Sequence, residues 1–143
     1  MNAIIVMLLL SVPDQAPRSR ALRVVDTYLF DHECEFACDP GDPDPSRDTA
    51  CIQEAIDLGS AIGAYNATEL PPGACLVNAT LVVPPSMGYS LYGHGPYRTD
   101  LIWTSEAAAD PMLLIDDVYV GRFYDFSLDS TASTVSTAVE LIN

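Results

Sequence analysis

The stretch ELPPGACLVNATLVVPPSMGYSLYGHG, from Glu69 to Gly95, decides the fold of this chain. It contains three short apolar runs rich in strand-forming residues, Ala74–Val77, Leu81–Val83 and Ser90–Tyr92. Each run is too short for a helix, and each is bounded by Pro or Gly residues that favour turns. We interpret the stretch as chain bending around one coil of a β-solenoid, on which further coils stack.

The composition of the chain limits which class of protein it can be and which partners it can bind. The chain has 143 residues, which suits one domain or a piece of a larger one, and 49% of them are hydrophobic, enough to build a core. Its net charge of -14 excludes nucleic acid and anionic membrane surfaces as partners, because both would be repelled. The same charge repels a polyuronate unless a cation such as Ca²⁺ bridges the two. The ordinary interpretation of this charge is a well-solvated surface suited to salt or to secretion.

The N-terminus carries the apolar run Ala3–Val12, about as long as the apolar core of a signal peptide and too short to span a bilayer. No basic residue precedes it, and Asp14-Gln15-Ala16 is a poor cleavage site. We interpret residues 1–20 as an export signal and linker, with a buried or frayed N-terminal segment as the alternative. Residues 21–143 then form the domain, and we expect the protein to be secreted.

Four cysteines, Cys34, Cys38, Cys51 and Cys75, form an even set that allows three full pairings. A zinc site built from His32, Cys34 and Cys38, with Cys51 or Cys75 as fourth ligand, is the alternative, but no Cys-x-x-Cys pair is present. In an exported chain we expect disulfides.

Ahead of the first coil, a leading strand is expected around Leu22–Val25, followed by a loop over His32–Asp48 that is crowded with Pro, Gly and acids. Clustered carboxylates suit Ca²⁺, yet the loop lacks the Gly and Glu of an EF-hand, and its prolines stiffen it. A solvated turn with a helix cap is the favoured interpretation. The acids concerned are Asp39, Asp42, Asp44 and Asp48.

A helical pattern begins at Asp48 in DTACIQEAIDLGSAIG, with Asp48 or Thr49 as N-cap and Gly59 or Gly63 as its end. This short amphipathic helix precedes the first coil, whose open apolar end needs a cover. We expect the helix to be that cap. Its expected apolar face comprises Cys51, Ile52, Ala55, Ile56 and Leu58, with Gln53, Glu54 and Asp57 facing outward.

Further short strand candidates follow the opening stretch, and the intervals from Leu81 to Leu101 and from Leu91 to Leu113 suit a solenoid repeat. An antiparallel sandwich or barrel is the alternative for strands this short. The candidates are Asp100–Trp103, Pro111–Ile115, Asp117–Val120, Asp125–Ser130 and Val135–Ile142.

Three segments in order resemble the entry of the pectate-lyase superfamily. GDPDPSRDTACIQEAID (Gly41–Asp57) is similar to its Gly-Asp loop and first helix, and LPPGACLV (Leu70–Val77) to its Leu-Pro-Pro-Gly strand. LVVPPSMGYSLYGHGPYRTDLIW (Leu81–Trp103) is similar to the continuation, and the resemblance covers Leu22–Asn143. It implies an all-β fold, a right-handed parallel β-helix of which these are the first coils, with a short N-terminal capping α-helix.

The resemblance also implies a disulfide arrangement. With the helix lying over the first coil, Cys51 and Cys75 come within reach of one another. We therefore expect Cys51–Cys75, and a local Cys34–Cys38 link or two free thiols. The chain stops inside an expected strand, whereas the catalytic coils of the superfamily lie further along, so we expect an N-terminal fragment of a longer protein.

Few residues are candidates for chemistry. Asp125, Ser127 and Asp129 alternate with Phe126 and Leu128, so both acids should point outward, but ~13 Å apart along one strand. Glycosidase carboxylate pairs stand roughly 5–9.5 Å apart, so this is a solvated face rather than an acid/base couple. We assign no catalytic, cofactor-binding or metal-binding residue.

Weaker candidates concern metal and sugar binding. Asp116 or Asp117 meeting Asp125 or Asp129 across coils would suit Ca²⁺. His94 is a weak candidate for catalysis because no acid or nucleophile stands at a readable spacing. The remaining candidates for binding a sugar or carboxylate are Arg98, Arg122, Tyr97 and Trp103, with rim or core packing as the alternative for the two aromatics.

The function expected is that of the N-terminal fragment of a secreted protein acting on polysaccharide by lyase or hydrolase chemistry, the chain alone being inactive. The alternative is a non-enzymatic β-helix, a structural or glycan-binding module of the tailspike or adhesin kind. Both take a polysaccharide or glycan as partner.

Overall fold

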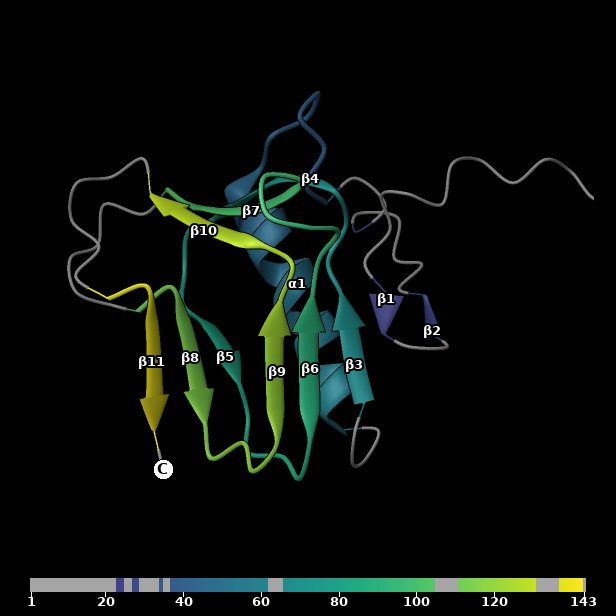
Figure 1. Cartoon of the computed structure of the whole chain (residues 1–143). Coiled ribbons are helices and arrows are strands. Elements are labelled where there is room, and N and C mark those ends of the chain that lie inside the picture. Colours follow the sequence, from purple (N-terminus) through teal and green to yellow (C-terminus); the bar gives the residue numbers. More distant parts are fainter. Residues whose placement is uncertain are drawn as a thin grey trace, which may run out of the picture.

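The computed structural model describes residues 23–24, 27–28, 34, 37–61, 66–104, 111–130 and 137–142 (Figure 1). The export segment expected in residues 1–20 lies outside these, as do His32 and Gly63. The described elements are β1 (Arg23–Val24), β2 (Thr27–Tyr28), α1 (Pro45–Ala61), β3 (Asn66–Glu69), β4 (Gly73–Val77), β5 (Leu81–Val83), β6 (Tyr89–Tyr92), β7 (Thr99–Trp103), β8 (Leu113–Asp116), β9 (Gly121–Tyr124), β10 (Ser127–Ser130) and β11 (Val139–Ile142).

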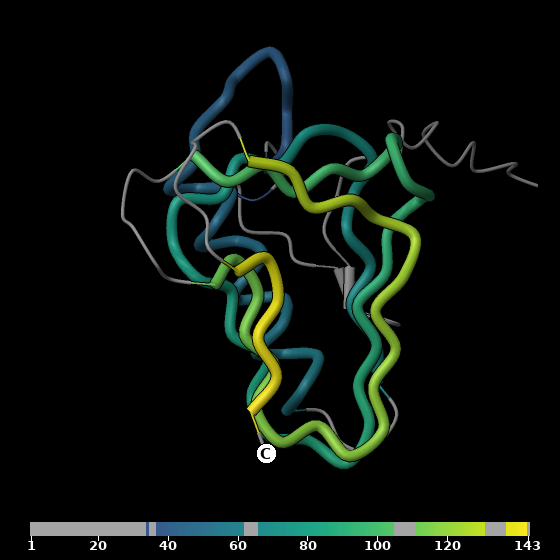
Figure 2. Tube along the Cα trace, turned by 60° about the vertical axis from the view of Figure 1, so that its left-hand side comes forward, coloured from purple at the N-terminus to yellow at the C-terminus, as the bar shows by residue number. Residues whose placement is uncertain are grey.

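The strands from β3 onward form three parallel sets, β3-β6-β9, β4-β7-β10 and β5-β8-β11. We call these sheets A, B and C. The chain passes through A, B and C in that order three times, and we call the passages coil 1 (β3–β5), coil 2 (β6–β8) and coil 3 (β9–β11). Figure 2 shows these passages lying one upon another. The parallel pairing between coils is wrong for an antiparallel sandwich or barrel.

The core lies between the three sheets, where alternate side chains of each strand point inward. In β5 the burial alternates, with Leu81 and Val83 buried, and in β7 Thr99, Leu101 and Trp103 are buried. This period of two is what a strand produces when one face meets a core. Each inward residue lies over its partner in the next coil, so the core consists of stacked columns.

The spacing between coils differs from the expected one. Leu81 pairs with Leu113 rather than aligning with Leu101, and Leu91 pairs with Phe123 rather than aligning with Leu113. A repeat within the expected range exists, but the named leucines are not the residues that stack, because the corners between sheets hold different numbers of residues in different coils. Apolar spacing alone cannot count those corner residues.

Most strand predictions coincide with strands, but one does not. Residues 117–120 form a turn in which Asp117 has φ 42°, a left-handed conformation that ends β8, and Val118 makes only an isolated bridge to Ser86. The strand follows at Gly121–Tyr124 instead. The expected leading strand exists as β1, which pairs antiparallel with both β2 and β3.

Helix α1 begins three residues earlier than expected. The Asp44 carboxylate accepts hydrogen bonds from the backbone N–H groups of Ser46 and Arg47, at 3.0 and 3.1 Å, which makes Asp44 the N-cap and Pro45 the first helical residue. The prediction of Asp48 or Thr49 as N-cap was wrong. Both lie inside the helix, where their side chains bond to coil 1.

The helix also continues past Gly59 to Ala61, so Gly59 is not its end. A Cβ at Gly59 would lie 2.5 Å from Thr68 Oγ1 and 2.9 Å from the Tyr89 ring. Gly59 is therefore required by the close approach of α1 to β3 and β6 rather than by a helix end. The predicted apolar face is correct except at Leu58, which is 37% exposed.

Side chains of α1 bond to the outer backbone edge of coil 1. The Gln53 amide donates to the carbonyl of Val82 and accepts from its N–H, both at 2.8 Å. Asp48 accepts from Leu76 N–H at 3.0 Å, and Thr49 Oγ1 accepts from Asn78 N–H at 3.0 Å. With β1 on β3, the outer edge of coil 1 is covered on all three sheets, so the helix caps the stack as expected.

All four cysteines are buried in disulfides, Cys34–Cys51 and Cys38–Cys75. The expected pairs Cys51–Cys75 and Cys34–Cys38 were wrong, and these sulfurs are not available as zinc ligands. The reason is the position of Cys34 beside α1 and of Cys38 beside β4. Asp48 accepts from Cys38 N–H at 2.9 Å and from Leu76 N–H, which brings Cys38 beside β4 and its Cys75.

Candidate functional site

The acids of the 39–48 loop are each engaged with the protein. Asp39 accepts from Gly41 N–H at 2.9 Å, Asp42 pairs with Arg47 at 2.7 Å, and Asp44 caps α1. Asp48 is 1% exposed. This is the turn with a helix cap that the sequence favoured. In the part of the chain that the structure describes, no group of three or more His, Cys, Asp or Glu side chains is arranged to hold a metal ion.

The pKa of Asp48 is raised above its ordinary value in the fold. Burial raises its pKa, while the N–H groups of Cys38 and Leu76 and the Arg47 guanidinium, 3.6 Å away, act in the opposite direction. Its carboxylate links Cys38, α1 and β4. Its role in this geometry is structural.

The other acids named from the sequence do not converge. Asp116 ends β8 in sheet C, whereas Asp129 lies on β10 in sheet B, so these two acids belong to different sheets. Asp125 lies in the bend before β10, with φ 59°, and not in the strand. Ser127 occupies the expected outward position and its hydroxyl donates to Asp100 of the neighbouring coil.

The aromatic and basic candidates separate into buried and exposed groups. Trp103 is 1% exposed and packs in the core, so its alternative interpretation was correct. Tyr97 is 90% exposed on the Gly95–Arg98 turn, where its φ of 68° is unusual for a non-glycine residue. His94 Nε2 lies 3.4 Å from the Glu69 carboxylate.

The outer face of sheet A brings together a second set of polar and aromatic residues. The register stacks Ser90 beside Arg122 and Tyr92 beside Tyr124. The two tyrosine rings stack with their centroids 5.5 Å apart and their planes 12° apart. We call Ser90, Tyr92, Arg122 and Tyr124 the tyrosine–arginine face.

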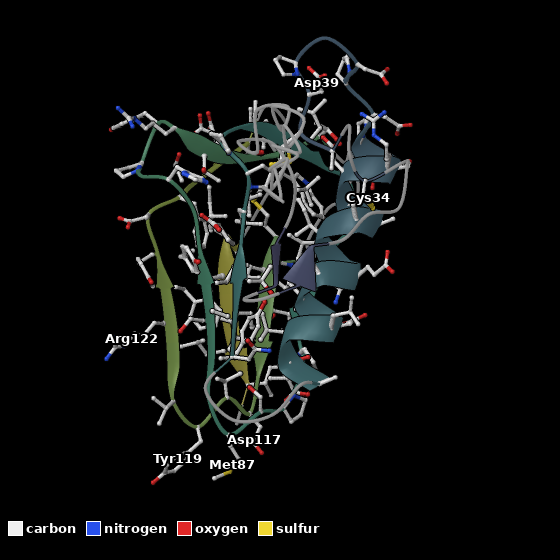
Figure 3. The ribbon with its side chains drawn as sticks, turned by 90° about the vertical axis from the view of Figure 1, so that its right-hand side faces the viewer. Cys34, Asp39, Met87, Asp117, Tyr119 and Arg122 are labelled. Carbon is white, nitrogen blue, oxygen red and sulfur yellow. A yellow bond between two sulfur atoms is a disulfide. The ribbon has the colours of Figure 1, made fainter. Side chains whose placement is uncertain are left out.

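Tyr124 and Arg122 are accessible to a ligand. Tyr124 is 45% exposed, and Arg122 projects from β9 on the side of the stack opposite α1 (Figure 3). Arg122, Phe123 and Tyr124 line a shallow, open depression. Glu69 precedes Tyr92 and Tyr124 in the same column, where it meets His94.

This arrangement suits binding rather than bond cleavage. A tyrosine ring held in place by a stacked neighbour offers a flat apolar surface to the C–H face of a sugar. The planar guanidinium beside it presents several N–H donors that match a carboxylate or a pair of hydroxyls. In the same column of sheet A, the Glu69 carboxylate lies beside Tyr92 and 3.4 Å from His94 Nε2.

Sequence reasoning named Arg122 but missed Ser90, Tyr92 and Tyr124. The available signal was the alternation in Tyr89-Ser90-Leu91-Tyr92, which puts Ser90 and Tyr92 on one face. The sequence did not reveal that β6 pairs with β9, since β9 itself was not predicted. Without that register the two tyrosines could not be placed beside each other.

A comparison of the chain with known protein families, curated proteins and solved structures finds no match in any of them. Among the described residues, no helix has the length and apolar character that crossing a bilayer requires.

Proposed function

We propose that this chain is the N-terminal, capping part of a secreted right-handed parallel β-helix protein that acts on polysaccharide, and that its tyrosine–arginine face binds glycan. The fold part of the proposal is supported by the threefold passage through sheets A, B and C and by the helix over coil 1. The right-handed course of the β-helix and the membership of the pectate-lyase superfamily are proposed from the sequence resemblance. The two disulfides agree with an oxidising, extracellular location.

The observation that carries the glycan-binding part is the Tyr92–Tyr124 stack beside Arg122. Stacking orders the Tyr124 ring in advance, so less entropy is lost when a sugar lies on it. Arg122 adds charge selectivity, because a uronate would gain a charge-assisted hydrogen bond that a neutral sugar lacks. Against this acts the acidic net charge of -14, which Ca²⁺ would offset by bridging carboxylates.

The second candidate is a non-enzymatic structural or glycan-binding module. It is favoured by the pairing of Glu69 with His94, which engages the acid in the column of Tyr92 and Tyr124. Under both candidates this chain binds glycan without cleaving it. They differ in whether coils elsewhere in a longer protein supply catalytic groups.

The test is binding of a panel of neutral oligosaccharides and oligouronides, with and without CaCl₂, by calorimetry. Tyr124→Ala should lower the affinity about tenfold, the effect of removing one stacking contact worth about 1.4 kcal/mol. Arg122→Ala should lower the affinity for oligouronides more than that for neutral sugars, because only the uronates lose a charge-assisted hydrogen bond. Tyr119→Ala is the control, because Tyr119 is 81% exposed in the turn before β9. Absence of binding to every glycan, or equal losses in Tyr119→Ala and Tyr124→Ala, would remove the proposal.

A further inference from the structure

The turn Gly95–Arg98, which we call the Tyr97 turn, holds a tyrosine in an unusual backbone conformation at the corner between sheets A and B. It is closed by a hydrogen bond from the Arg98 N–H to the Gly95 carbonyl, at 3.0 Å. Pro96 occupies its second position and Tyr97 its third, with φ 68°. A positive φ after proline is the type II arrangement, in which Gly or Asn normally takes the third position. Tyr97 is therefore strained, because its Cβ crowds the neighbouring backbone in the left-handed region.

Packing does not compensate for this strain. Tyr97 is 90% exposed, so its ring gains little from contacts within the described chain. The other three non-glycine residues with positive φ in the described chain are Cys38, Asp117 and Asp125. Cys38 is buried and held by its disulfide, and aspartate tolerates the left-handed region. A bulky, exposed residue kept in a strained conformation is typical of positions that contact a ligand.

The Tyr97 turn is fixed to both neighbouring coils and adjoins the tyrosine–arginine face. On one side the Gly95 N–H donates to the carbonyl of Asp125, at 2.8 Å, and Asp125 directly follows Tyr124. On the other side the Gly73 N–H of β4 donates to the Arg98 carbonyl, at 2.7 Å. A ring carried by a turn that is bonded on both sides loses little freedom when a ligand lies on it.

We propose that the Tyr97 turn is a second glycan subsite, in which the Tyr97 ring lies against the C–H face of a sugar. The class of ligand rests on the proposed function, and the subsite extends it, because one oligosaccharide contacts Tyr124 on sheet A and Tyr97 on the adjoining corner. Arg98 follows Tyr97 in the chain and is exposed. Its guanidinium offers N–H donors to the hydroxyl or carboxylate groups of the sugar bound at Tyr97.

The length of the oligosaccharide is the variable that reveals a second subsite. A short ligand occupies one subsite at a time, whereas a longer chain contacts both and gains from each without paying twice for association. We therefore expect the loss of affinity on removing the Tyr97 ring to grow with the number of sugar residues in the ligand.

The experiment is calorimetry of the disulfide-intact chain with oligogalacturonides and with cello-oligosaccharides, each from disaccharide to hexasaccharide. Tyr97→Asn should lower the affinity for the hexasaccharide of the series that binds by about tenfold, and that for the disaccharide less. Tyr97→Phe keeps the ring and should bind within about twofold of the wild type. Asparagine adopts the left-handed region at lower cost, so the Tm of Tyr97→Asn should equal or exceed that of the wild type.

The matched control is Tyr119→Asn, which removes a tyrosine that is 81% exposed but has no positive φ. It should leave the affinity at every ligand length unchanged. Wild-type binding by Tyr97→Asn, with weakened binding by Tyr124→Ala, would overturn the second subsite and leave the proposed function standing. A Tyr97→Phe variant as weak as Tyr97→Asn, or a lower Tm for Tyr97→Asn, would also overturn the subsite. Absence of binding to every oligosaccharide by the wild type would remove both proposals.

Discussion

At the scale of single residues, Asp48 of α1 is notable because its buried carboxylate bonds to the backbone of two other segments, at Cys38 and at Leu76 of β4. It accepts from two backbone N–H groups, at Cys38 and Leu76, and lies near Arg47. An unfolded aspartate has a pKa of about 3.9. Burial raises the pKa of Asp48 in the fold, so ionisation is disfavoured there relative to the unfolded chain.

The sign of the pH dependence follows from that direction. The contribution of Asp48 to the free energy of unfolding is complete below the unfolded pKa of about 3.9 and declines as the pH rises through the raised folded pKa. We expect the urea midpoint of the wild type to fall from pH 4 to pH 7 more steeply than that of Asp48→Asn, which cannot ionise. Parallel curves for the two proteins would show that the carboxylate does not contribute in this way.

The Gln53 side chain makes the backbone hydrogen bonds that a neighbouring strand would otherwise make on the outer edge of β5. Its amide makes two hydrogen bonds to the backbone of Val82, so Gln53→Ala leaves an N–H and a carbonyl of β5 unpaired. We expect a loss of about 1–3 kcal/mol in the free energy of unfolding, the usual cost of an unsatisfied buried group. The neighbouring Glu54 is exposed, and Glu54→Ala should stay within about 0.5 kcal/mol of the wild type. Equal urea midpoints for the two variants would contradict the role of Gln53.

At the scale of elements, the two disulfides fasten one segment to two different partners. Cys34–Cys51 joins it to α1 across 17 residues, and Cys38–Cys75 joins it to β4 across 37 residues. In the chain-entropy description, closing these loops stabilises the fold by about 3.1 and about 3.8 kcal/mol respectively. We therefore expect Cys38→Ala/Cys75→Ala to unfold at lower urea concentration than Cys34→Ala/Cys51→Ala. The reverse order would indicate that contacts in the folded state outweigh loop closure.

Elements bounded by strong local signals were predictable, whereas those fixed by distant contacts were not. Leu81–Val83 is bounded by Pro84-Pro85 and was predicted with its correct limits. Residues 117–120 look more strand-like than Gly121–Tyr124, yet the left-handed Asp117 and the stacking on β6 select the latter. The disulfide pairs were predicted wrongly and the tyrosine–arginine face was missed for the same reason, since both depend on which segments lie side by side.

At the scale of the whole molecule, the structure is a stack whose stability should decrease from one end to the other. Coil 1 is held by α1 and two disulfides, and strands β7 and β8 of coil 2 are paired on both sides. Strands β10 and β11 are paired on one side only in the described chain, and inward residues such as Leu141 face solvent. Local opening is cheapest where few buried contacts must be broken.

Hydrogen exchange measured on the wild-type chain at low protein concentration tests this gradient. We expect the amides of Thr99–Trp103 to exchange far more slowly than those of Ser127–Ser130, although the two strands pair with each other in register. Uniform protection across the three coils would mean that the molecule opens as one cooperative unit, because contacts between coils would then outweigh the uncovered end.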